Sequence, residues 1–598
     1  MLLAACLLSA LQGPDWSGFP AFVWRKRYRK SEAPAELLAG FGGVDVKRDG
    51  EADWVREAGL DFYVGHGPGR DDLHLDADAP RWREPWDRWF RTRSDEYLVR
   101  EPCLTDPETS ARLDETLERT LAQHAAGTGF FVALGDEISL TPSQGVPWDG
   151  CRSETCRDAW HTRRGEDASM PATDAVRLAW TLGDTSQIGT WLDLRRFHRE
   201  VVEGQVLRLA EHARERAPGV ALGVLGTIGA TPFGGLDLAR MAAAVDVVEC
   251  YPEGDARTEL ATLRAAGRTE ARSLLTVFLS DHTPDGVAWQ VYEHWLRGGD
   301  GVVIWCDADL EESEPHRARL AEALADVRRL KAELGAFRPA PGGIAVVRDD
   351  DSAALAFLAE ARLDGRTWPN RFPSYQERHG RREVAVRSWL RYVEDCGLLP
   401  GVVRLDDLPG PLVFPVVVLP HVAVLAEAGI AALRGFVEAG GILLVEGELG
   451  TFSPAGERRS GDVAAELAAL REGAVFRMER GLGDYAERRL TMRPEKRRSL
   501  LPDEAWSLLE RVGIEGLPLV SENRMPWLVA RAPHPGEGRV LVAAIPNLTT
   551  PAERERLRFV PARLPGGVDA DVRWIHPAAD DSGEVSVRPG EPLVFELR

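Results

Sequence analysis

GFFVALGDEISLTP, residues 129–142, places an apolar run directly before two adjacent acids. The run 130–134 has the length of a strand and is rich in aromatic and branched side chains, and it breaks at Gly135. In a β/α barrel, catalytic side chains lie where a strand ends, and partial desolvation of a carboxyl there favours the neutral form that a general acid needs. We therefore predict that Glu137 is a catalytic acid/base, with Asp136 beside it. The alternative is a helix N-terminus, where acids are also favoured.

Short apolar runs alternate with helix-like stretches on both sides of this strand. Eight runs are typical of strands, at 21–24, 43–46, 61–64, 130–134, 221–225, 245–250, 274–279 and 301–305. Amphipathic stretches between several of them predict helices, notably at 110–126, 192–217, 237–244 and 287–297. Eight strands separated by helices predict a parallel (β/α)₈ TIM barrel. An open doubly wound sheet is the alternative, but no Gly-x-Gly-x-x-Gly follows any of these strands, so a dinucleotide fold is not indicated.

A second carboxylate is needed if Glu137 acts in a retaining glycosidase, because the nucleophile lies about 5–5.5 Å from the acid/base. Asp281 follows the seventh strand and is the positional candidate for this nucleophile. A loop aspartate that caps the next helix is the alternative interpretation. Glu249 and Glu253, around the end of the sixth strand, are the fallback carboxylates.

Sugar sites use flat apolar faces beside hydrogen-bonding groups, and aromatic rings provide such faces. Tyr251 ends the sixth strand, Trp305 ends the eighth, His66 follows the third and His282 comes just after the seventh. Because the strand ends of a barrel converge on one rim, we predict that these residues and Asp136 bind the substrate. Ordinary packing is the alternative for each ring.

The composition is that of a globular protein, and a length of 598 residues predicts several domains. The formal charge of −21 argues against nucleic acid and anionic membranes as general partners, and it fits a neutral oligosaccharide or glycoside. The apolar segment 1–13, MLLAACLLSALQG, is too short to span a bilayer. It resembles a secretory or lipoprotein signal, so we expect export to the periplasm or beyond rather than a cytoplasmic location. No other run is long enough to be transmembrane.

Changes in pattern divide the rest of the chain into three domains. The barrel is expected over 14–338, and the Pro- and Gly-rich PAPGG at 339–343 marks its end. Over 339–516, strands such as 414–419 alternate with helices such as 423–439, which predicts an open parallel α/β sheet. Over 517–598, short alternating strands between Pro and Gly turns predict a small antiparallel β domain.

Three segments resemble the β-galactosidases of glycoside hydrolase family 42. They are WDGCRSETCRDAWHTRRG at 148–165, WLDLRRFHREVVEGQVLRLAEHARERAPGVALGV at 191–224 and VAWQVYEHWLRGGDGVVIW at 287–305. The resemblance implies a retaining glycoside hydrolase for β-galactosides or related sugars, an amidotransferase-like second domain and a homotrimer. A glutaminase is not indicated, because the turn at 447–449 carries no Cys.

The sequence departs from this family at both catalytic positions. The family has Asn-Glu where this chain has Asp136-Glu137, and its nucleophile is Glu where this chain offers Asp281. The alternative is therefore a non-catalytic carbohydrate-binding or assembly protein on a degenerate barrel.

The same resemblance implies a metal site. Some family members hold a structural zinc with four cysteines, and Cys103, Cys151 and Cys156 match three of those positions, with Ser153 where a further thiolate would stand. A disulfide among these cysteines is the alternative in an exported protein. No cofactor is required for the predicted chemistry.

Overall fold

The structure, a computed structural model, describes residues 16–597 apart from several segments. These are 29–34, 39, 47–50, 70–72, 75–79, 125–128, 141–148, 228–236, 253–254, 281, 336, 340, 365–379, 409, 479–480, 490–495, 497–498, 513–518, 522–526, 534–539, 547–554, 560–571, 577–584 and 588–590. The predicted signal segment 1–13 and two candidate carboxylates, Asp281 and Glu253, lie outside the described residues.

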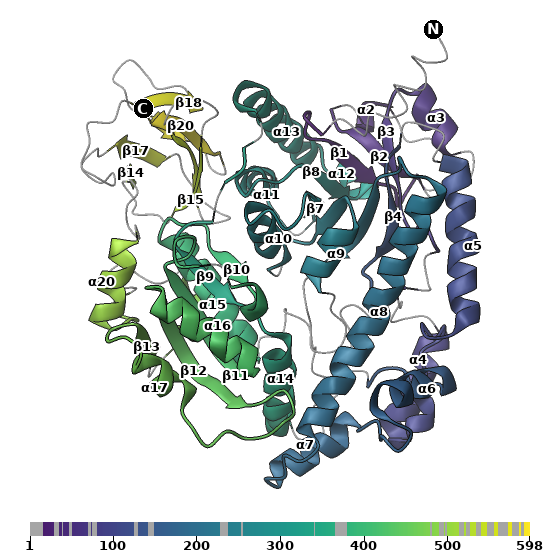
Figure 1. Ribbon diagram of the computed structural model, residues 1–598. Helices are drawn as coiled ribbons and strands as arrows, with labels where there is room; N and C mark the ends of the chain where they lie inside the picture. The colour runs from purple at the N-terminus through teal and green to yellow at the C-terminus, as the bar shows by residue number, and fades with distance from the viewer. Residues whose placement is uncertain are drawn as a thin grey trace.

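Eight parallel strands form a closed barrel, in which β1 pairs with both β2 and β8 (Figure 1). The strands are β1 (Ala21–Trp24), β2 (Gly42–Val46), β3 (Asp61–Val64), β4 (Gly129–Asp136), β5 (Leu222–Thr227), β6 (Val247–Cys250), β7 (Arg272–Phe278) and β8 (Gly301–Trp305). The predicted (β/α)₈ barrel is therefore confirmed, with all eight strands close to their expected places.

Helices surround the barrel and occupy the connections between its strands. They are α2 (Ala35–Leu38), α3 (Glu51–Glu57), α4 (Pro80–Thr92), α5 (Pro107–His124), α6 (Glu154–Arg164), α7 (Thr173–Thr181), α8 (Ile188–Arg216), α9 (Leu238–Ala244), α10 (Ala256–Ala265), α11 (Pro284–Leu296), α12 (Asp307–Glu312) and α13 (Glu314–Leu334). The connection after β4 is the elaborate one, because α6, α7 and the long α8 all lie between β4 and β5. It therefore carries much of the structure next to Glu137.

The barrel interior is filled largely by aromatic rings. Phe22, Tyr63 and Phe131 share one buried core, in which Tyr63 stacks on Phe131 with ring centroids 4.9 Å apart. Space for these rings depends on Gly223 of β5, because a Cβ there would lie 2.7 Å from the Phe131 ring. The filled interior leaves the carboxyl ends of the strands as the place for a site.

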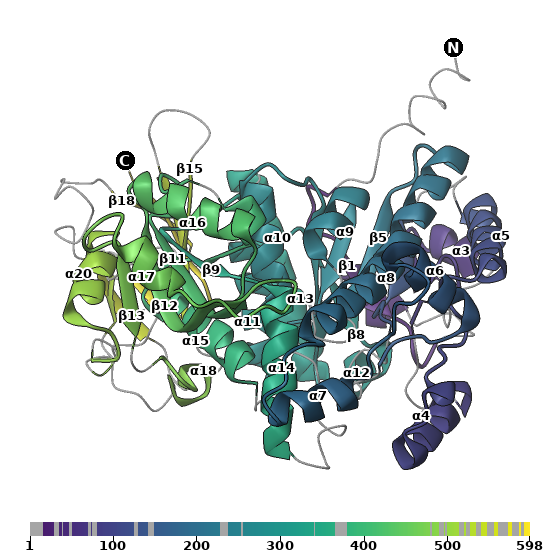
Figure 2. The same cartoon turned by 60° about the horizontal axis from the view of Figure 1, so that its bottom comes forward.

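The second domain is an open parallel sheet with helices packed beside it (Figure 2). An apolar core lies on each face of this sheet. The strand order is β10-β9-β11-β12-β13. The elements are β9 (Ile344–Val347), α14 (Asp350–Asp364), α15 (Arg381–Asp395), β10 (Gly401–Val403), β11 (Val416–Val424), α16 (Glu427–Glu438), β12 (Ile442–Phe452), α17 (Val463–Ala468), β13 (Val475–Met478), α18 (Tyr485–Arg488) and α20 (Asp503–Arg511). The predicted open α/β sheet is confirmed.

Barrel helix α10 covers the outer strand of this sheet. The backbone N–H of Val402 in β10 donates to Thr262 Oγ1 of α10, at 3.0 Å. Arg348, just after β9, forms a buried ion pair with Glu259 of α10. Polar contacts therefore join the two domains along a shared, buried face.

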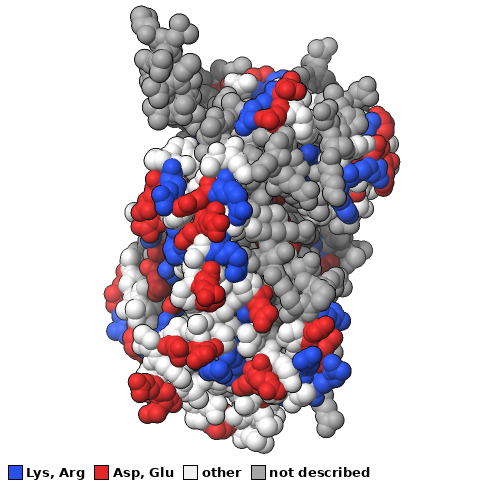
Figure 3. Space-filling model, turned by 90° about the vertical axis from the view of Figure 1, so that its right-hand side faces the viewer, with Lys and Arg blue, Asp and Glu red and all other residues white. Residues whose placement is uncertain are grey.

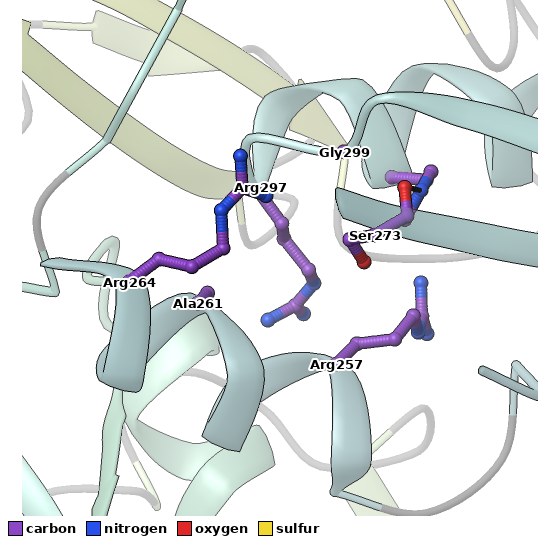
Figure 4. Close-up of a pocket in the computed structure, with 7 residues that line it drawn as sticks. Arg257, Ala261, Arg264, Ser273, Arg297 and Gly299 are labelled. Carbon is purple, nitrogen blue, oxygen red and sulfur yellow. Dashed lines mark hydrogen bonds between the residues drawn. The ribbon is translucent and has the colours of Figure 1, made fainter. Parts of the chain in front are cut away.

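A second buried ionic group lies at the same junction. Arg257, Arg264 and Arg297 converge on one small cavity (Figure 4). Arg297 Nε lies 2.5 Å from Glu293 Oε1 of α11, and its NH2 lies 2.5 Å from Glu394 Oε1 of α15 in the second domain. Arg297 therefore links a barrel helix to a second-domain helix through buried charges.

The C-terminal domain contains two antiparallel sheets, β14-β17-β19 and β15-β16-β20-β18. The strands are β14 (Leu519–Ser521), β15 (Trp527–Pro533), β16 (Val540–Pro546), β17 (Glu555–Phe559), β18 (Val572–His576), β19 (Val585–Val587) and β20 (Leu593–Leu597). Leu528, Ala543 and Val594 belong to the same apolar core as barrel residues, so this domain also packs on the barrel. The predicted antiparallel domain is confirmed.

The surface carries both signs of charge. Figure 3 shows acidic and basic side chains interspersed over one face. Within the part of the chain that the structure describes, no helix combines the length and apolar character that crossing a membrane requires.

Candidate active site

Glu137 directly follows β4, and its backbone adopts a left-handed conformation with φ of 47°. Its N–H donates to the carbonyl of Leu225 in β5, at 3.1 Å. Gly226, the next residue of β5, also has positive φ, at 62°, and a Cβ there would lie 2.7 Å from both Asp136 Oδ1 and Glu137 Cγ. The absence of a side chain at Gly226 therefore makes room for both acids at the mouth.

Replacing Gly226 by Ala is expected to damage this strand end. The new methyl group would collide with both acids, and alanine disfavours a φ of 62°, so we expect a loss of about 1–3 kcal/mol in the free energy of unfolding of the barrel domain. Urea unfolding measures the loss, and hydrolysis assays measure any displacement of Glu137. Gly204→Ala is the matched control, because a Cβ at that exposed position in α8 meets nothing within 4 Å. Equal unfolding midpoints for the two variants would contradict the expectation.

Tyr251 and His74 contact the Glu137 carboxyl. Tyr251 Oη donates to Glu137 Oε1 at 2.6 Å, and His74 Nδ1 lies 3.6 Å from Glu137 Oε2. Burial, followed by the charges of Asp136 and Glu137, raises the pKa of Tyr251 well above its usual value, so the phenol keeps the proton that it donates. The Glu137 side chain is 21% exposed, which leaves it accessible from the barrel mouth.

Aromatic rings continue from Tyr251 around the mouth. The Tyr251 and Phe278 centroids lie 5.6 Å apart, and those of Phe278 and Trp305 lie 6.4 Å apart. Trp305 then stacks on Trp24 of β1 at 4.0 Å. All four rings are partly exposed, so together they form a curved apolar wall that runs over β6, β7, β8 and β1. We call these four residues the aromatic arc.

Asp136 and His66 lie on the other side of Glu137. His66 Nε2 is 3.8 Å from Asp136 Oδ2, and His66 has a φ of 57°. The two residues thus come from the adjacent ends of β3 and β4. Polar groups therefore occupy one part of the mouth and the aromatic arc occupies the other.

The structure brings together most of the residues that the sequence nominates. Tyr251, His66 and Asp136 gather around Glu137, and Trp305 joins them through the aromatic arc. His282 lies just before α11, and its carbonyl accepts a hydrogen bond from His316 Nε2 at 2.7 Å. The proposed binding role of His282 stays a prediction.

β7 ends earlier than the sequence suggested. Its last residue is Phe278, three residues before Asp281, and the Phe278 ring belongs to the aromatic arc. By sequence, the predicted nucleophile Asp281 comes after this strand, as expected, with two residues between them. Its position relative to Glu137 lies outside the described residues.

Sequence reasoning missed several residues of this site. His74 contacts Glu137, while Phe278 and Trp24 complete the aromatic arc. His74 gave no signal, because it follows no apolar strand. The signal for Trp24 was present, since it ends the first predicted strand just as Trp305 ends the eighth.

The three predicted zinc ligands also come together. The sulfur atoms of Cys103, Cys151 and Cys156 all lie within 4.8 Å of one another, and those of Cys103 and Cys151 are 3.6 Å apart. This distance far exceeds an S–S bond of about 2.05 Å, so these residues are thiols here. Hydrogen bonds from Cys151 and Cys156 lower the pKa of Cys103, and the same contacts raise those of the other two.

These thiols fit a zinc ion. Zn–S bonds of about 2.3 Å in a tetrahedron place sulfur atoms about 3.8 Å apart, close to the separation of Cys103 and Cys151. The Ser153 hydroxyl lies 3.0 Å from Cys103 Sγ and caps α6 by accepting from the Cys156 N–H. We propose that the three thiolates hold a structural zinc that joins the loop before α5 to the start of α6.

Metal analysis of the purified protein is expected to find about one zinc per chain, and Cys103→Ser should lose it because too few thiolates remain. Cys396→Ala is the matched control, since that buried cysteine lies in the second domain. Intact mass and thiol titration distinguish the alternatives. A mass lower by two protons, with two thiols lost, would show a disulfide and contradict the zinc proposal.

Comparisons with known proteins place this architecture. Neither a protein-family model nor a curated protein matches the sequence. Among solved structures, a catalytic mutant of a family 42 β-galactosidase from G. stearothermophilus matches with a TM-score of 0.66 over 98% of this chain and 100% of that chain. The fold is that of the family 42 β-galactosidases. Sequence identity to that structure is 13%, so this similarity concerns the fold.

Other structures with the family 42 fold agree. The β-galactosidase from Bacillus circulans sp. alkalophilus matches with a TM-score of 0.61 and 13% identity, over 97% of this chain and 99% of that chain. An exo-carrageenase of the same family from Bacteroides ovatus matches with a TM-score of 0.57 and 11% identity, over 100% of this chain and 87% of that chain. The family 42 fold thus carries enzymes named for different substrates, and the substrate has to be argued from the site.

Proposed function

We propose that this protein is a retaining glycoside hydrolase that acts on β-galactosides or related neutral sugars. The observation that carries the proposal is the environment of Glu137. An accessible carboxyl at the end of β4 accepts a hydrogen bond from a phenol and faces a mouth with a continuous aromatic arc. Such a mouth suits a pyranoside, because a sugar ring has apolar C–H faces and polar edges.

In the proposed reaction, Glu137 donates its proton to the glycosidic oxygen while a carboxylate attacks the anomeric carbon. The bond to the leaving group breaks and a glycosyl ester forms on the enzyme. Glu137, now ionised, then removes a proton from water, which attacks the same carbon and releases the sugar and the carboxylate. Asp281 is the proposed nucleophile from its place after β7.

Glu249 is a poor alternative as the nucleophile. Its side chain is 4% exposed, and burial followed by the charge of Asp136 raises its pKa to about 8. It is therefore largely neutral at neutral pH, and attack requires an ionised and accessible carboxylate. Asp281 and Glu253 remain as candidates, and Asp281 is the nucleophile that we propose to test first.

Phe278 supports a second candidate function. The strand end at which barrel glycosidases present a nucleophile is occupied here by an aromatic ring. A binding protein would retain the aromatic arc and need no carboxylate at that place. The second candidate is therefore a non-catalytic carbohydrate-binding protein with the same sugar specificity.

Hydrolysis of a panel of aryl glycosides by the wild-type protein distinguishes the glycoside hydrolase from the non-catalytic binding protein. The hydrolase proposal expects release of the phenol from at least one neutral β-glycoside, with retained configuration in the sugar product. Calorimetric titration with the same neutral sugars tests the binding candidate. Sugar binding without any turnover would overturn the hydrolase proposal and favour the second one. The homotrimer implied by the resemblance stays a prediction.

A further inference from the structure

Asp307 is a fully buried acid at the start of α12, two residues beyond Trp305, and the proposed reaction does not use it. Its carboxylate accepts hydrogen bonds from three successive backbone N–H groups of the loop that follows β1. Oδ1 accepts from Lys26 at 2.8 Å and from Arg27 at 2.9 Å, and Oδ2 accepts from Tyr28 at 2.9 Å. Successive N–H groups that converge in this way form a concave anion site, and here an acid of the same chain fills it. We call Asp307 and these three N–H groups the β1 clasp.

The β1 clasp is the buried attachment of a loop that has little other support. The side chains of Lys26 and Arg27 are exposed, so apolar burial contributes little to holding them. Arg27 forms ion pairs with Glu311 and Glu312 of α12, but all three side chains are solvent-exposed, and exposed pairs contribute little. A buried carboxylate, in contrast, depends on its hydrogen bonds, because burying an unpaired charge is costly. The hydrogen bonds to Asp307 therefore fix where this loop lies.

The β1 clasp adjoins one end of the aromatic arc. Trp24 and Trp305 are register partners in β1 and β8, and their rings stack with an interplanar angle of 24°. The chain that leaves Trp24 enters the clasp after one residue, and the chain that leaves Trp305 reaches Asp307 after one residue. The residue between Trp24 and the clasp is Arg25, whose N–H donates to Asp45 Oδ1 of β2 at 2.6 Å. The backbone beyond Trp24 is thus attached to β2 on one side and to α12 on the other.

The stack determines how Trp305 is presented. The Trp24 ring covers one face of Trp305, so Trp305 is supported from that side and its opposite face remains for a ligand. Phe278 continues the wall from Trp305, with the two rings inclined at 56°. A sugar ring packs best on a flat aromatic face at a fixed angle, and a face that is ordered before the ligand arrives costs less entropy on binding.

We propose that Asp307 is a positioning residue for sugar binding, which acts through the β1 clasp by holding Trp24 against Trp305. The inference rests on the proposed function, in which the aromatic arc binds the sugar. Asp307 touches neither Glu137 nor the aromatic rings in the contacts described above, so its effect reaches the sugar only through the loop. It should therefore change the affinity for the sugar and leave the bond-breaking step nearly unchanged.

Three variants test this path. Asp307→Ala removes all the acceptors of the clasp, and it is expected to raise KM for an aryl glycoside about three- to tenfold with kcat within about twofold, because the ligand must then order the indole rings. Asp307→Asn keeps one acceptor oxygen and should raise KM less. Trp24→Leu removes the stack itself and should raise KM at least as much as Asp307→Ala. The double variant Trp24→Leu/Asp307→Ala should match Trp24→Leu alone, since two residues on one path are not additive.

Asp300→Asn is the matched control for a purely structural effect. Asp300 is also fully buried and lies at the opposite end of β8, where its Oδ2 accepts from the Ser273 N–H at 2.9 Å. This variant weakens a comparable buried carboxylate, so it should lower thermal stability without changing KM.

Circular dichroism reports the stack without any turnover. Two indoles stacked at 4.0 Å couple electronically and give a paired positive and negative band in the far ultraviolet, which we call the couplet. The couplet is expected in the wild type and in Asp300→Asn, weaker in Asp307→Asn and weakest in Asp307→Ala. Its loss in Trp24→Leu identifies the band.

The outcomes separate this inference from the proposed function. A couplet that stays unchanged in both Asp307 variants would overturn the inference, whether or not the protein hydrolyses a glycoside. A weakened couplet with unchanged KM, or additive effects in the double variant, would also overturn it. If Asp307→Ala does not fold, the comparison of Asp307→Asn with Trp24→Leu carries the test. A wild type that shows the couplet and hydrolyses no glycoside would overturn the hydrolase proposal alone, and calorimetric affinity for neutral sugars then replaces KM.

Discussion

Glu137→Gln is expected to lower kcat/KM for aryl glycoside hydrolysis by about 10²–10⁴-fold, which is the usual contribution of a positioned general acid/base. The amide has nearly the same size as the carboxyl and can still contact Tyr251, so the fold should be unaffected. It can neither donate a proton to the glycosidic oxygen nor remove one from water. Steady-state kinetics across leaving groups of different acidity measures the effect.

The dependence on leaving group makes this test specific. An acidic phenol leaves without help, so the first step should be slowed least for such substrates and most for poor leaving groups. Glu211→Gln, at an exposed position of α8, is the matched control and should retain wild-type rates. Uniform activity of Glu137→Gln across the series, equal to that of the control, would remove Glu137 from the proposed reaction.

Arg297→Met is expected to cost up to about 3–5 kcal/mol in stability, because it removes one basic partner from each of two buried acids. Glu293 and Glu394 are both less than 2% exposed. Burial alone would raise the pKa of Glu293, but Arg257 and Arg297 outweigh it and hold that pKa below the usual value. Without Arg297, Glu293 retains Arg257 and Glu394 retains Arg391, so each acid loses one of two partners.

Differential scanning calorimetry and hydrogen exchange measure this loss. The chain has several domains, so one unfolding free energy does not describe it, and exchange at α11 and α15 reports the local effect. The control is Arg216→Met, because the exposed pair of Arg216 with Glu118 should contribute at most about 1 kcal/mol. Equal exchange in the two variants would show that the Arg297 bridge contributes nothing to the junction.

The architecture could be predicted from the sequence because each strand and helix is indicated by a pattern of residues that are close together in the chain. Each barrel strand is a short apolar run between polar segments, and the run 130–134 ends at a glycine followed by two acids. The same alternation predicted the second domain and the C-terminal sheets. Such patterns depend on neighbours in the chain, and the structure preserves them.

The partners of Glu137 could not be predicted in the same way. Tyr251 was nominated as a substrate platform, yet its hydroxyl reaches across the end of β5 to Glu137. That contact exists only because the barrel closes with a particular strand stagger, which no local pattern specifies. The raised pKa of Glu249 depends likewise on its burial and on the acids that surround it after folding.

The end of β7 shows a different limit of prediction from sequence, which concerns the exact residue at which a strand ends. The sequence LLTVFLS contains no glycine, proline or charged residue that marks its end, so the last residue of the strand could not be located to better than a few positions. The structure ends the strand at Phe278, and an aromatic side chain therefore takes the rim position. An apolar run can predict that a strand exists without fixing which of its residues comes last.

The contact between Val402 and Thr262 also bears on aggregation, in addition to the stability of the domain junction. β10 is the outermost strand of its sheet, and a bare strand edge is a template on which another chain can pair and aggregate. The barrel blocks this edge with α10, and Thr262 occupies a donor that a foreign strand would otherwise use. The barrel therefore protects the β10 edge of the second domain from pairing with another chain. For this reason the two α/β domains cannot simply be separated at the linker between them.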